Sequence, residues 1–269
     1  MKFLRYPGGK RKLLDFLSDY LPDGRDIEGT YIEPFVGGGS IFFYVGPKRA
    51  ILADLNQDLI DLYEGIKNSP IEVWKIFESF PSGKANYYRV RDDETSVQKP
   101  LEYRAARILY LNRTCFKGMW RHNASGNFNV GYGGEERRWV VTQDSLIQVS
   151  NALRNIKIVQ ADFEETLDSV SDGDFLFLDP PYKPGEKNLD ELHYLNGSFA
   201  FHEQERLAEK IIQITRGKNI KWLMTNSSHP EIRELYEDFN IVSVPKGTSS
   251  IVGVYTENAQ EVLISNYQM

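Results

Sequence analysis

Short apolar runs recur along the chain and predict buried β-strands. Two lie early in the chain, at Tyr31–Val36 and Ala50–Leu55. Most of the runs are rich in Ile, Val, Leu and Phe, which is typical of parallel strands that are buried on both faces. Five more follow in the second half, at Ile156–Asp162, Asp174–Leu178, Ile220–Thr225, Ile241–Val244 and Glu261–Asn266.

Helical patterns alternate with these strands. Asn56–Lys67 and Glu203–Thr215 both carry apolar residues at helical spacing. The alternation predicts an α/β fold in which helices cover both faces of one sheet. Because only a loop separates the last two runs, we expect an antiparallel strand to complete the sheet.

Residues 68–140 break the alternation. Pro70–Phe80 and Leu101–Leu111 have helical patterns. Asn112–Gly134 is rich in Gly, Asn and aromatic residues, a composition typical of a hairpin with loops. The sequence therefore predicts one α/β domain, formed by residues 1–67 and 141–269, that is interrupted by an inserted domain at 68–140.

Composition narrows the class of protein. The 269 residues are 41% hydrophobic and 26% charged, as in soluble globular proteins. No apolar run approaches the roughly 18–20 residues of a membrane span, and the first residues do not resemble a signal peptide. Cys115 is the one cysteine, and the four histidines lack ligand spacing, so we expect no disulfide and no metal. These features suit a cytoplasmic protein.

The net charge of −6 hides two basic segments. Residues 1–12 carry five basic side chains, among them Lys2, and no acidic one. Residues 104–138 carry seven basic side chains against Glu135 and Glu136. Such segments are compatible with a site for a polyanion, although charge alone favours solvated faces.

The clearest chemical signal is Asp179-Pro180-Pro181-Tyr182, which follows the apolar run before it. This is the carboxyl end of a buried strand, where open α/β sheets bind ligands. The exocyclic amine of adenine is a poor nucleophile because its lone pair is delocalised into the ring. The Asp179 carboxylate and the Pro180 carbonyl could each accept one N–H and so direct the lone pair at a methyl donor. Tyr182 offers an aromatic face to the base. The alternative is a simple proline turn that Asp179 initiates.

Two further turns could hold a ligand. Glu33–Ser40 contains three consecutive glycines, which let the backbone approach a ligand closely, and Ser40 could cap the next helix. Asp54 ends the second strand, where a carboxylate can accept ribose hydroxyls; the alternative is a helix cap, for which Asn56 is an equal candidate. Near the N-terminus, the turn Tyr6-Pro7-Gly8-Gly9-Lys10 could present backbone donors and a positive charge to a carboxylate.

In this order, the segments resemble the D12 or Dam-like DNA adenine-N6 methyltransferases, a family of the alpha group of amino-methyltransferases. The resemblance covers nearly the whole chain, although Tyr6 and Pro7 depart from the family's N-terminal W-x-G-G-K. The matching segments are Tyr6–Lys10, Glu33–Ser40, Asp54, Ala161–Phe163, Asp179–Tyr182 and, in the insertion, Asn112-Arg113, Gly118–Asn123 and Gly126–Val130.

The resemblance implies a seven-stranded Rossmann-like methyltransferase sheet with an inserted, mostly helical DNA-recognition domain that carries a β-hairpin. It also implies S-adenosylmethionine as donor and double-stranded DNA as substrate, with the target adenine flipped out of the duplex. We expect a monomeric bacterial or phage enzyme, such as one of a restriction-modification system.

The resemblance further implies which residues form the site. Asp179, Pro180, Pro181 and Tyr182 would be catalytic. The donor would contact Tyr6, Gly9, Lys10, Glu33, Phe35, Gly37, Gly38, Gly39, Ser40, Asp54, Asp162 and Phe163. DNA would contact Arg113, Phe116, Lys117, Trp120, Arg121, Asn123, Asn127 and Asn129.

Two of these positions bear on the recognised sequence. Phe116 keeps the family's aromatic wedge, whereas Lys117 replaces an amide, so a GATC-like target is compatible with the pattern and not fixed by it. Arg121 is expected to meet O6 and N7 of a guanine, with a phosphate contact as the alternative.

Other functions are compatible with parts of this pattern. An RNA adenine would need the same chemistry as a DNA adenine. A protein amide is the substrate of enzymes with Asn-Pro-Pro-Tyr, but Asp179 and the basic insertion argue against it. A catalytically inactive DNA-binding module of the same fold is disfavoured because Asp179 and the glycines are intact.

Overall fold

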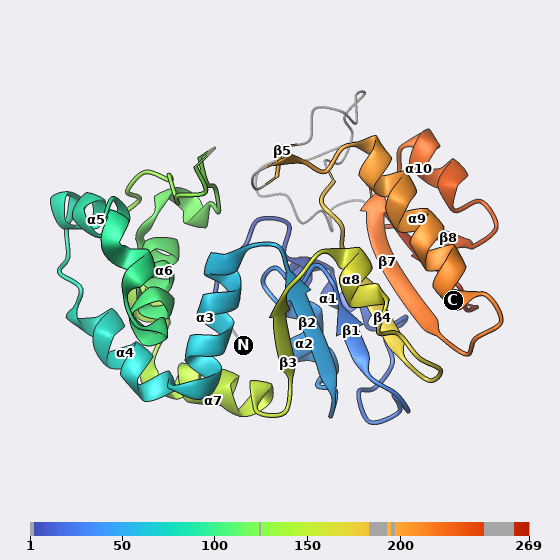
Figure 1. Ribbon diagram of the computed structural model, residues 1–269, viewed down its shortest axis with the longest axis horizontal. Helices are drawn as coiled ribbons and strands as arrows, with labels where there is room; N and C mark the ends of the chain where they lie inside the picture. The colour runs from blue at the N-terminus through green and yellow to red at the C-terminus, as the bar shows by residue number, and fades with distance from the viewer. Residues whose placement is uncertain (1–2, 124, 183–192, 195–196, 245–260, 269) are drawn as a thin grey trace.

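A seven-stranded sheet forms the centre of the computed structural model, which describes residues 3–123, 125–182, 193–194, 197–244 and 261–268 (Figure 1). Lys2 of the first basic segment lies outside the described residues. The strand order is β3-β2-β1-β4-β7-β9-β8, and each strand overlaps one of the seven predicted runs. The strands are β1 (Tyr31–Glu33), β2 (Ala50–Asp54), β3 (Lys157–Gln160), β4 (Phe175–Leu178), β7 (Lys221–Ser227), β8 (Asn240–Ser243) and β9 (Glu261–Ser265).

Strand direction follows from the connections. Strands β3, β2, β1, β4 and β7 pair in parallel, as chains that return through helices must. Strand β9 pairs antiparallel with both β7 and β8, which confirms the antiparallel strand expected from the absence of a helical pattern between the last two runs. A separate two-stranded ribbon, β5 (His193–Tyr194) with β6 (Gly197–Ser198), was not predicted.

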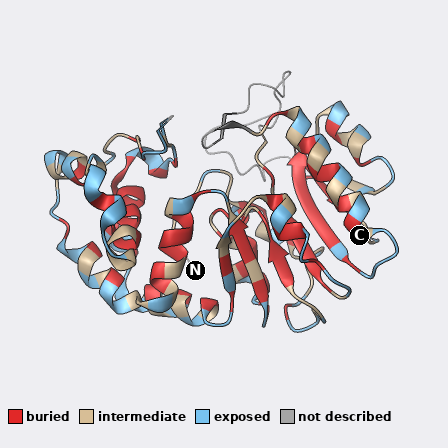
Figure 2. Ribbon diagram, in the orientation of Figure 1, coloured by how far each residue is buried: buried red, intermediate tan, exposed pale blue. Residues whose placement is uncertain are grey.

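The sheet is buried on both faces, as the apolar runs predict (Figure 2). In β4, Phe175 and Phe177 belong to one hydrophobic core, and Leu176 and Leu178 belong to another, because successive side chains point to opposite faces. The first core includes residues of the short η1 (Lys10–Leu13), which precedes α1, and of α1 (Leu14–Leu17), α2 (Ser40–Val45), α3 (Gln57–Asn68) and α7 (Gln143–Leu153). The second core includes residues of α8 (Phe163–Leu167), α9 (Phe201–Thr215) and α10 (Pro230–Leu235).

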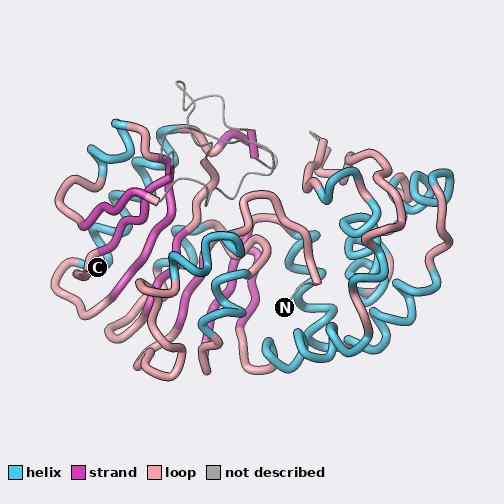
Figure 3. Tube along the Cα trace, turned by 180° about the vertical axis from the view of Figure 1, so that it is seen from behind, coloured by secondary structure: helices cyan, strands magenta, loops and turns pink. Residues whose placement is uncertain are grey.

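The insertion is helical and lies beside α3, at one end of the sheet (Figures 1 and 3). Helix α6 packs closely against α3, since a Cβ atom added at Gly65 would lie 2.4 Å from Cβ of Ala105. Helix α5 was not predicted. The elements are α4 (Pro70–Ser79), α5 (Lys84–Arg91), η2 (Glu94–Gln98), α6 (Leu101–Thr114), η3 (Phe116–Gly118) and η4 (Arg138–Val140).

The segment predicted as a hairpin begins later than expected, because α6 continues to Thr114. Its two arms pair through isolated antiparallel bridges, Cys115 with Tyr132 and His122 with Phe128. Backbone hydrogen bonds from Phe116 to the carbonyl of Gly131 and from Asn129 to that of Arg121 hold the arms together.

The second basic segment is neither a solvated face nor a continuous polyanion site, because several of its arginines point inward. Arg107 donates to the last carbonyls of α5, and Arg138 donates to the carbonyls of Phe77 and Phe80, at the end of α4. Both guanidinium groups therefore close helix ends from the interior. The exposed basic side chains of the segment include Lys117, Arg121 and Arg137.

Candidate active site

A cavity of about 1920 Å³ lies where β1, β2 and β4 end, the place at which open α/β sheets bind ligands. It is lined by all the predicted catalytic and donor-binding residues. Of the predicted DNA contacts, Lys117, Asn123, Asn127 and Asn129 line it, whereas Arg113, Phe116, Trp120 and Arg121 do not. The fold thus brings together segments that are far apart in the sequence.

Asp179 lies at the end of β4 and receives two partners on one oxygen. The ammonium group of Lys10 lies 2.7 Å from Oδ1, and Thr225 on β7 donates its hydroxyl to the same oxygen at 2.8 Å. Among the described residues, Oδ2 has no such contact. As a carboxylate, Asp179 therefore keeps one oxygen free to accept a further hydrogen bond.

The two prolines differ in how their carbonyls are used. Gln204, which is buried on α9, donates to the carbonyl of Pro181 at 3.1 Å. The carbonyl of Pro180 has no comparable partner among the described residues, so it is available to a ligand. Tyr182 follows, with Nζ of Lys10 5.0 Å from its ring centroid, and burial raises the pKa of the Tyr182 phenol well above its ordinary value.

The glycine-rich turn is held in shape from two sides. Gly37 and Gly39 have φ of 45° and 62°, in the left-handed region where a side chain would be strained. Tyr63 on α3 donates its hydroxyl to the carbonyl of Gly37 at 2.9 Å, and Gly37 donates its N–H to Oδ2 of Asp54 at 3.1 Å. Gly39, not Ser40, is the residue that precedes α2, and the Ser40 side chain makes no cap, so the predicted cap is wrong.

Asp54 supports this turn and does not cap a helix. Its Oδ1 accepts the N–H of Asn56 at 3.0 Å, while the Asn56 side chain accepts from Asp58 and Leu59 and so caps α3. Of the two candidates for the cap, the structure selects Asn56. Burial raises the pKa of Asp54 to about 6. A carboxylate that already binds two N–H groups still has lone pairs to accept ribose hydroxyls.

Glu33 lies beneath the turn. It is 3% exposed and accepts the hydroxyl of Tyr31 at 2.8 Å. Burial raises the pKa of Glu33 well above its ordinary value. Glu33 is therefore packed mainly within the protein, although it also lines the cavity.

Three aromatic rings form a shelf in the cavity. The ring centroids of Phe35, Phe163 and Phe199 lie 5.6 to 6.0 Å from one another. Asp162 precedes Phe163, caps α8 through the N–H of Glu164, and binds Arg206 on α9 at 2.8 and 2.9 Å. The shelf can hold a planar base, with the Asp162 carboxylate at its edge.

The N-terminal turn lies against the glycine-rich turn. Gly9 donates to the carbonyl of Tyr6 at 3.2 Å, and a Cβ atom added at Gly37 would lie 2.9 Å from the Tyr6 ring. Lys10 differs from the prediction in its partner. It was expected at the donor, whereas its ammonium group pairs with the carboxylate of Asp179.

The predicted DNA contacts fall into an exposed and a buried set. Phe116, Lys117, Arg121, Asn123 and Asn127 are exposed, and Asn129 is partly so. Arg121 binds Asn129 through Nε at 2.8 Å and Nη2 at 3.3 Å, so its guanidinium group is already oriented.

Arg113 and Trp120 belong to the buried set. Arg113 donates twice to the carbonyl of Arg137, and burial lowers its pKa to about 10. Trp120 is 9% exposed, and its ring centroid lies 5.4 Å from that of Tyr6 and 6.2 Å from that of Phe128. These positions are at odds with the prediction that both touch DNA; they support the hairpin from inside.

Sequence reasoning missed Phe199 of the aromatic shelf. It also missed three polar residues of the site: Thr225, Gln204 and Arg206. Each binds a motif residue from an element distant in the chain, so no local signal marks it. In α9, the buried Gln204 among apolar neighbours was the one available hint, because a buried amide requires hydrogen-bond partners. Within the described part of the chain, no cluster of His, Cys, Asp or Glu could hold a metal, and no helix is long and apolar enough to cross a membrane.

Sheet order, the antiparallel β9 and a cavity at the carboxyl edge define an α/β methyltransferase-like protein. More narrowly, the model of the D12 class N6 adenine-specific DNA methyltransferases matches residues 6–249, and the chain belongs to this family.

The sequences of three relatives match this chain over nearly their full lengths. A type II methyltransferase of Lactococcus lactis subsp. cremoris is 32% identical, covering 98% of this chain and 95% of the relative. A type II methyltransferase of Methanocaldococcus jannaschii is 34% identical and covers 98% of both chains. The DNA adenine methylase of Escherichia coli (strain K12) is 30% identical, covering 99% of this chain and 95% of the relative.

Proposed function

We propose that this chain transfers a methyl group from S-adenosylmethionine to N6 of an adenine flipped out of double-stranded DNA, with Asp179–Tyr182 as the catalytic segment. The observation that carries the proposal is the joint placement of two acceptors. Asp179, whose Oδ2 is not used by Lys10 or Thr225, and Pro180 both follow β4 and line the cavity that the glycine-rich turn also lines.

The residues present fit an S-adenosylmethionine molecule. The Phe35, Phe163 and Phe199 shelf suits its adenine, with Asp162 at the edge, and Asp54 suits its ribose hydroxyls. The turn can bring its backbone close to the cofactor because it consists of glycines. Cβ atoms added at Gly37 and Gly38 would lie 2.9 and 3.1 Å from Tyr6, and one added at Gly39 would lie 2.7 Å from the Tyr63 hydroxyl. When bound, the cofactor supplies an activated methyl group on sulfur.

Asp179 and Pro180 would prepare the target nitrogen. Each accepts one N–H of the amine, which withdraws the lone pair from the ring and points it along the axis of methyl transfer. The nitrogen would then form its bond to the methyl group that the cofactor would supply from sulfur, and its extra proton would leave to water. Positioning and charge complementarity supply the acceleration, so no strong base is required.

The flipped base would stack on Tyr182. Such stacking contributes about 1–3 kcal/mol by alanine substitution. Before the base enters, Lys10 occupies Oδ1 of Asp179, which fixes the rotation of the carboxylate. In the hairpin, Lys117, Arg121 and Asn123 would contact the duplex, with Phe116 as a wedge.

A single copy supplies both halves of this site, because the donor-binding and hairpin residues line one cavity of one chain. We therefore propose a monomer that acts on duplex DNA. A bacterial or phage-infected cytoplasm would be its setting, and a restriction-modification system one such context.

The test is direct methylation. Purified protein is incubated with unmethylated plasmid or phage DNA and S-adenosylmethionine, and the modified adenines are mapped by sequencing. We expect N6-methyladenine at one short sequence, and none with Asp179→Ala. Methylation of RNA in place of DNA, or of a protein amide, would contradict the proposal, as would DNA binding without transfer.

A further inference from the structure

We propose that His122 is a positioning residue through which DNA recognition and donor binding influence one another. The inference rests on the proposed function and deepens it, because it concerns how the two halves of the site communicate. It starts from a contact between segments distant in the sequence, the hairpin and α3.

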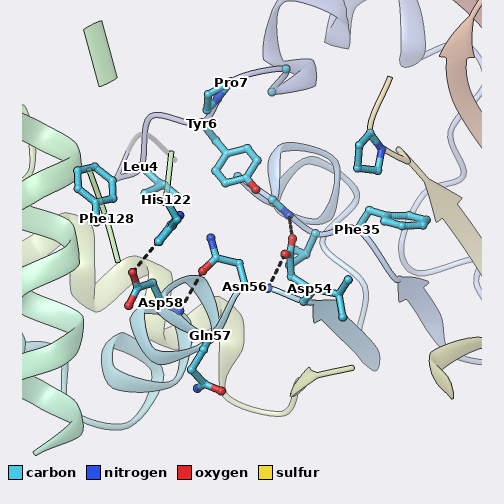
Figure 4. Close-up of a pocket in the computed structure, with 18 of the residues that line it drawn as sticks. Leu4, Tyr6, Pro7, Phe35, Asp54, Asn56, Gln57, Asp58, His122 and Phe128 are labelled. Carbon is cyan, nitrogen blue, oxygen red and sulfur yellow. Dashed lines mark hydrogen bonds and ion pairs between the residues drawn. The ribbon is translucent and has the colours of Figure 1, made fainter. Parts of the chain in front are cut away.

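A continuous series of hydrogen bonds joins the hairpin to the glycine-rich turn (Figure 4). Nε2 of His122 lies 2.8 Å from Oδ2 of Asp58. Asp58 donates its backbone N–H to the side chain of Asn56 at 3.0 Å. Asn56 in turn donates its N–H to Oδ1 of Asp54, and Gly37 donates to Oδ2 of Asp54.

His122 is held firmly within the hairpin, so its ring moves when the hairpin moves. Its side chain is 3% exposed, and its ring lies 5.7 Å from Phe128 and 6.2 Å from Trp120. His122 and Phe128 also pair through the backbone. Since this cluster packs as a unit, a shift of the hairpin on DNA must displace the ring and with it Asp58.

Asp58 is well placed to pass such a shift on. It is the second residue of α3, and a short loop precedes the helix, from Asp54 at the end of β2 to the capping residue Asn56. The cap ties this loop rigidly to the first turn of the helix. A change at Asp58 therefore reaches the carboxylate proposed for the donor ribose, and donor binding reaches the hairpin by the same contacts.

The chain offers a matched control. Arg104 on α6 binds Asp61 at 2.7 Å, one turn further along α3. This ion pair also joins the insertion to α3. Asp61 accepts a further hydrogen bond from the side chain of Gln57 at 2.7 Å, but among the described residues no hydrogen bond continues from that side chain to Asn56 or Asp54. Arg104→Ala breaks a comparable link and leaves the series through Asn56 intact.

The experiment measures how strongly DNA binding changes the affinity for a donor analogue. The dissociation constant of S-adenosylhomocysteine is determined by calorimetry without DNA and with a saturating duplex that contains the mapped target. In the wild type, we expect DNA to change this constant by about fivefold or more. In His122→Ala and Asp58→Ala, we expect the change to fall to within about twofold of none, with no further loss in the double variant.

Two variants separate positioning from folding. Asp58→Asn keeps an acceptor for the imidazole and should retain most of the coupling. Arg104→Ala should retain all of it. By reciprocity, the donor analogue must change the dissociation constant of the duplex by the same factor as the duplex changes that of the analogue, and both must fall together in His122→Ala.

Several outcomes would overturn the inference. These are a wild type that methylates adenine but shows no coupling, a loss of coupling in Arg104→Ala as large as in His122→Ala, and equal weakening of the analogue with and without DNA. Failure of the proposed function would be distinct, since the wild type would then form no N6-methyladenine.

Discussion

Lys10 and Asp179 depend on one another. Lys10 is 4% exposed, and apart from Asp179 it donates to the carbonyl of Gly8, at 3.1 Å. A buried charge that loses its partner is costly, whereas replacing both members by apolar groups is often tolerated. With Asp179 in the role proposed above, this ion pair would join methyl transfer to local stability.

Asp179→Ala should therefore have two effects. Methyl transfer should fall by at least about 10²–10³-fold, since a group that stabilises developing charge is lost. The Tm should also fall, because the Lys10 ammonium is left unpaired. Adding Lys10→Met should restore the Tm and not the activity, as single-turnover rates and thermal melts would show. Near-normal turnover in Asp179→Ala would remove Asp179 from catalysis.

Asp54 should make donor binding pH-dependent. Because burial raises its pKa to about 6, the carboxyl group becomes protonated, and a poorer acceptor, as the pH is lowered through 6. We expect the affinity for S-adenosylmethionine to fall in this range in the wild type. Asp54→Asn should bind the donor about 1.5–3 kcal/mol more weakly at pH 7.5, without this fall. Calorimetry from pH 5 to 8 checks both; an unchanged affinity in the variant would exclude the ribose contact.

The same carboxyl group also makes the free energy of unfolding depend on pH, but in the opposite direction to donor affinity. The folded protein holds this proton up to about pH 6, whereas the unfolded chain releases it near its ordinary pKa of 3.8. Asp54 therefore lowers the free energy of unfolding progressively as the pH rises between these values. The deficit remains above pH 6, on the order of 2–3 kcal/mol. Urea melts from pH 5 to 7.5 should show this decline in the wild type, and a smaller one in Asp54→Asn.

Residue types in motifs could be predicted from the sequence, but their partners could not. Asp179 and Asp54 stand at strand ends, where the chemistry of an acidic group is readable locally. That Lys10 would pair with Asp179, and Arg206 with Asp162, depends on how distant segments meet in three dimensions.

At the scale of elements, the hairpin presents Arg121 already oriented by Asn129. If Arg121 meets a guanine, Arg121→Ala should cost about 1–3 kcal/mol on the target and relax discrimination at one base pair. Asn129→Ala should do the same more weakly, because the guanidinium group survives without its support. Methylation rates on singly substituted duplexes measure this.

A phosphate contact would give a different result. Loss of Arg121 would then weaken all sequences about equally and reduce the salt slope of binding by roughly one unit. Affinities at several salt concentrations distinguish the two cases. A uniform loss with unchanged discrimination would mean that Arg121 anchors DNA without reading it.

The end of α4 depends on a single side chain. Arg138 is fully buried, and its guanidinium group donates to the carbonyls of Phe77 and Phe80. Arg138→Ala should leave these carbonyls unsatisfied beside a cavity and cost about 3 kcal/mol or more, which lowers the Tm by roughly 6–12 °C. Arg137→Ala is the control, since that side chain is exposed. Equal melting temperatures for the two variants would show that α4 does not need this closure.

Elements with a dense apolar pattern were predicted well. All seven strands lie where the runs place them, and α4 and α6 begin at the predicted residues Pro70 and Leu101. Helix α5 was missed because few of its residues are apolar, and the inward arginines were missed because charge in a sequence does not reveal burial. The hairpin's late start follows from α6, which continues to Thr114.

At the scale of the whole molecule, the class of fold could be read from the order of strands and helices, and the family from the order of motifs. The placement of the insertion on α3 could not. That contact depends on side chains from two segments, such as Gly65 and Ala105, whose fit emerges only when both helices are formed.

This contact has a consequence for redesign. One hydrophobic core includes residues of α3, α4 and α6, so exchanging residues 68–140 between relatives would cut through close packing and disturb both parts. The hairpin is easier to exchange, because it begins at Cys115 after α6 and its second arm reaches Tyr132. An antiparallel backbone bridge joins these two residues. Grafting the stretch between these two residues transplants the exposed hairpin side chains while the packed interface stays native. A chimera with a new target sequence is therefore best built by exchanging the hairpin alone. His122 should be kept so that the grafted hairpin still contacts Asp58.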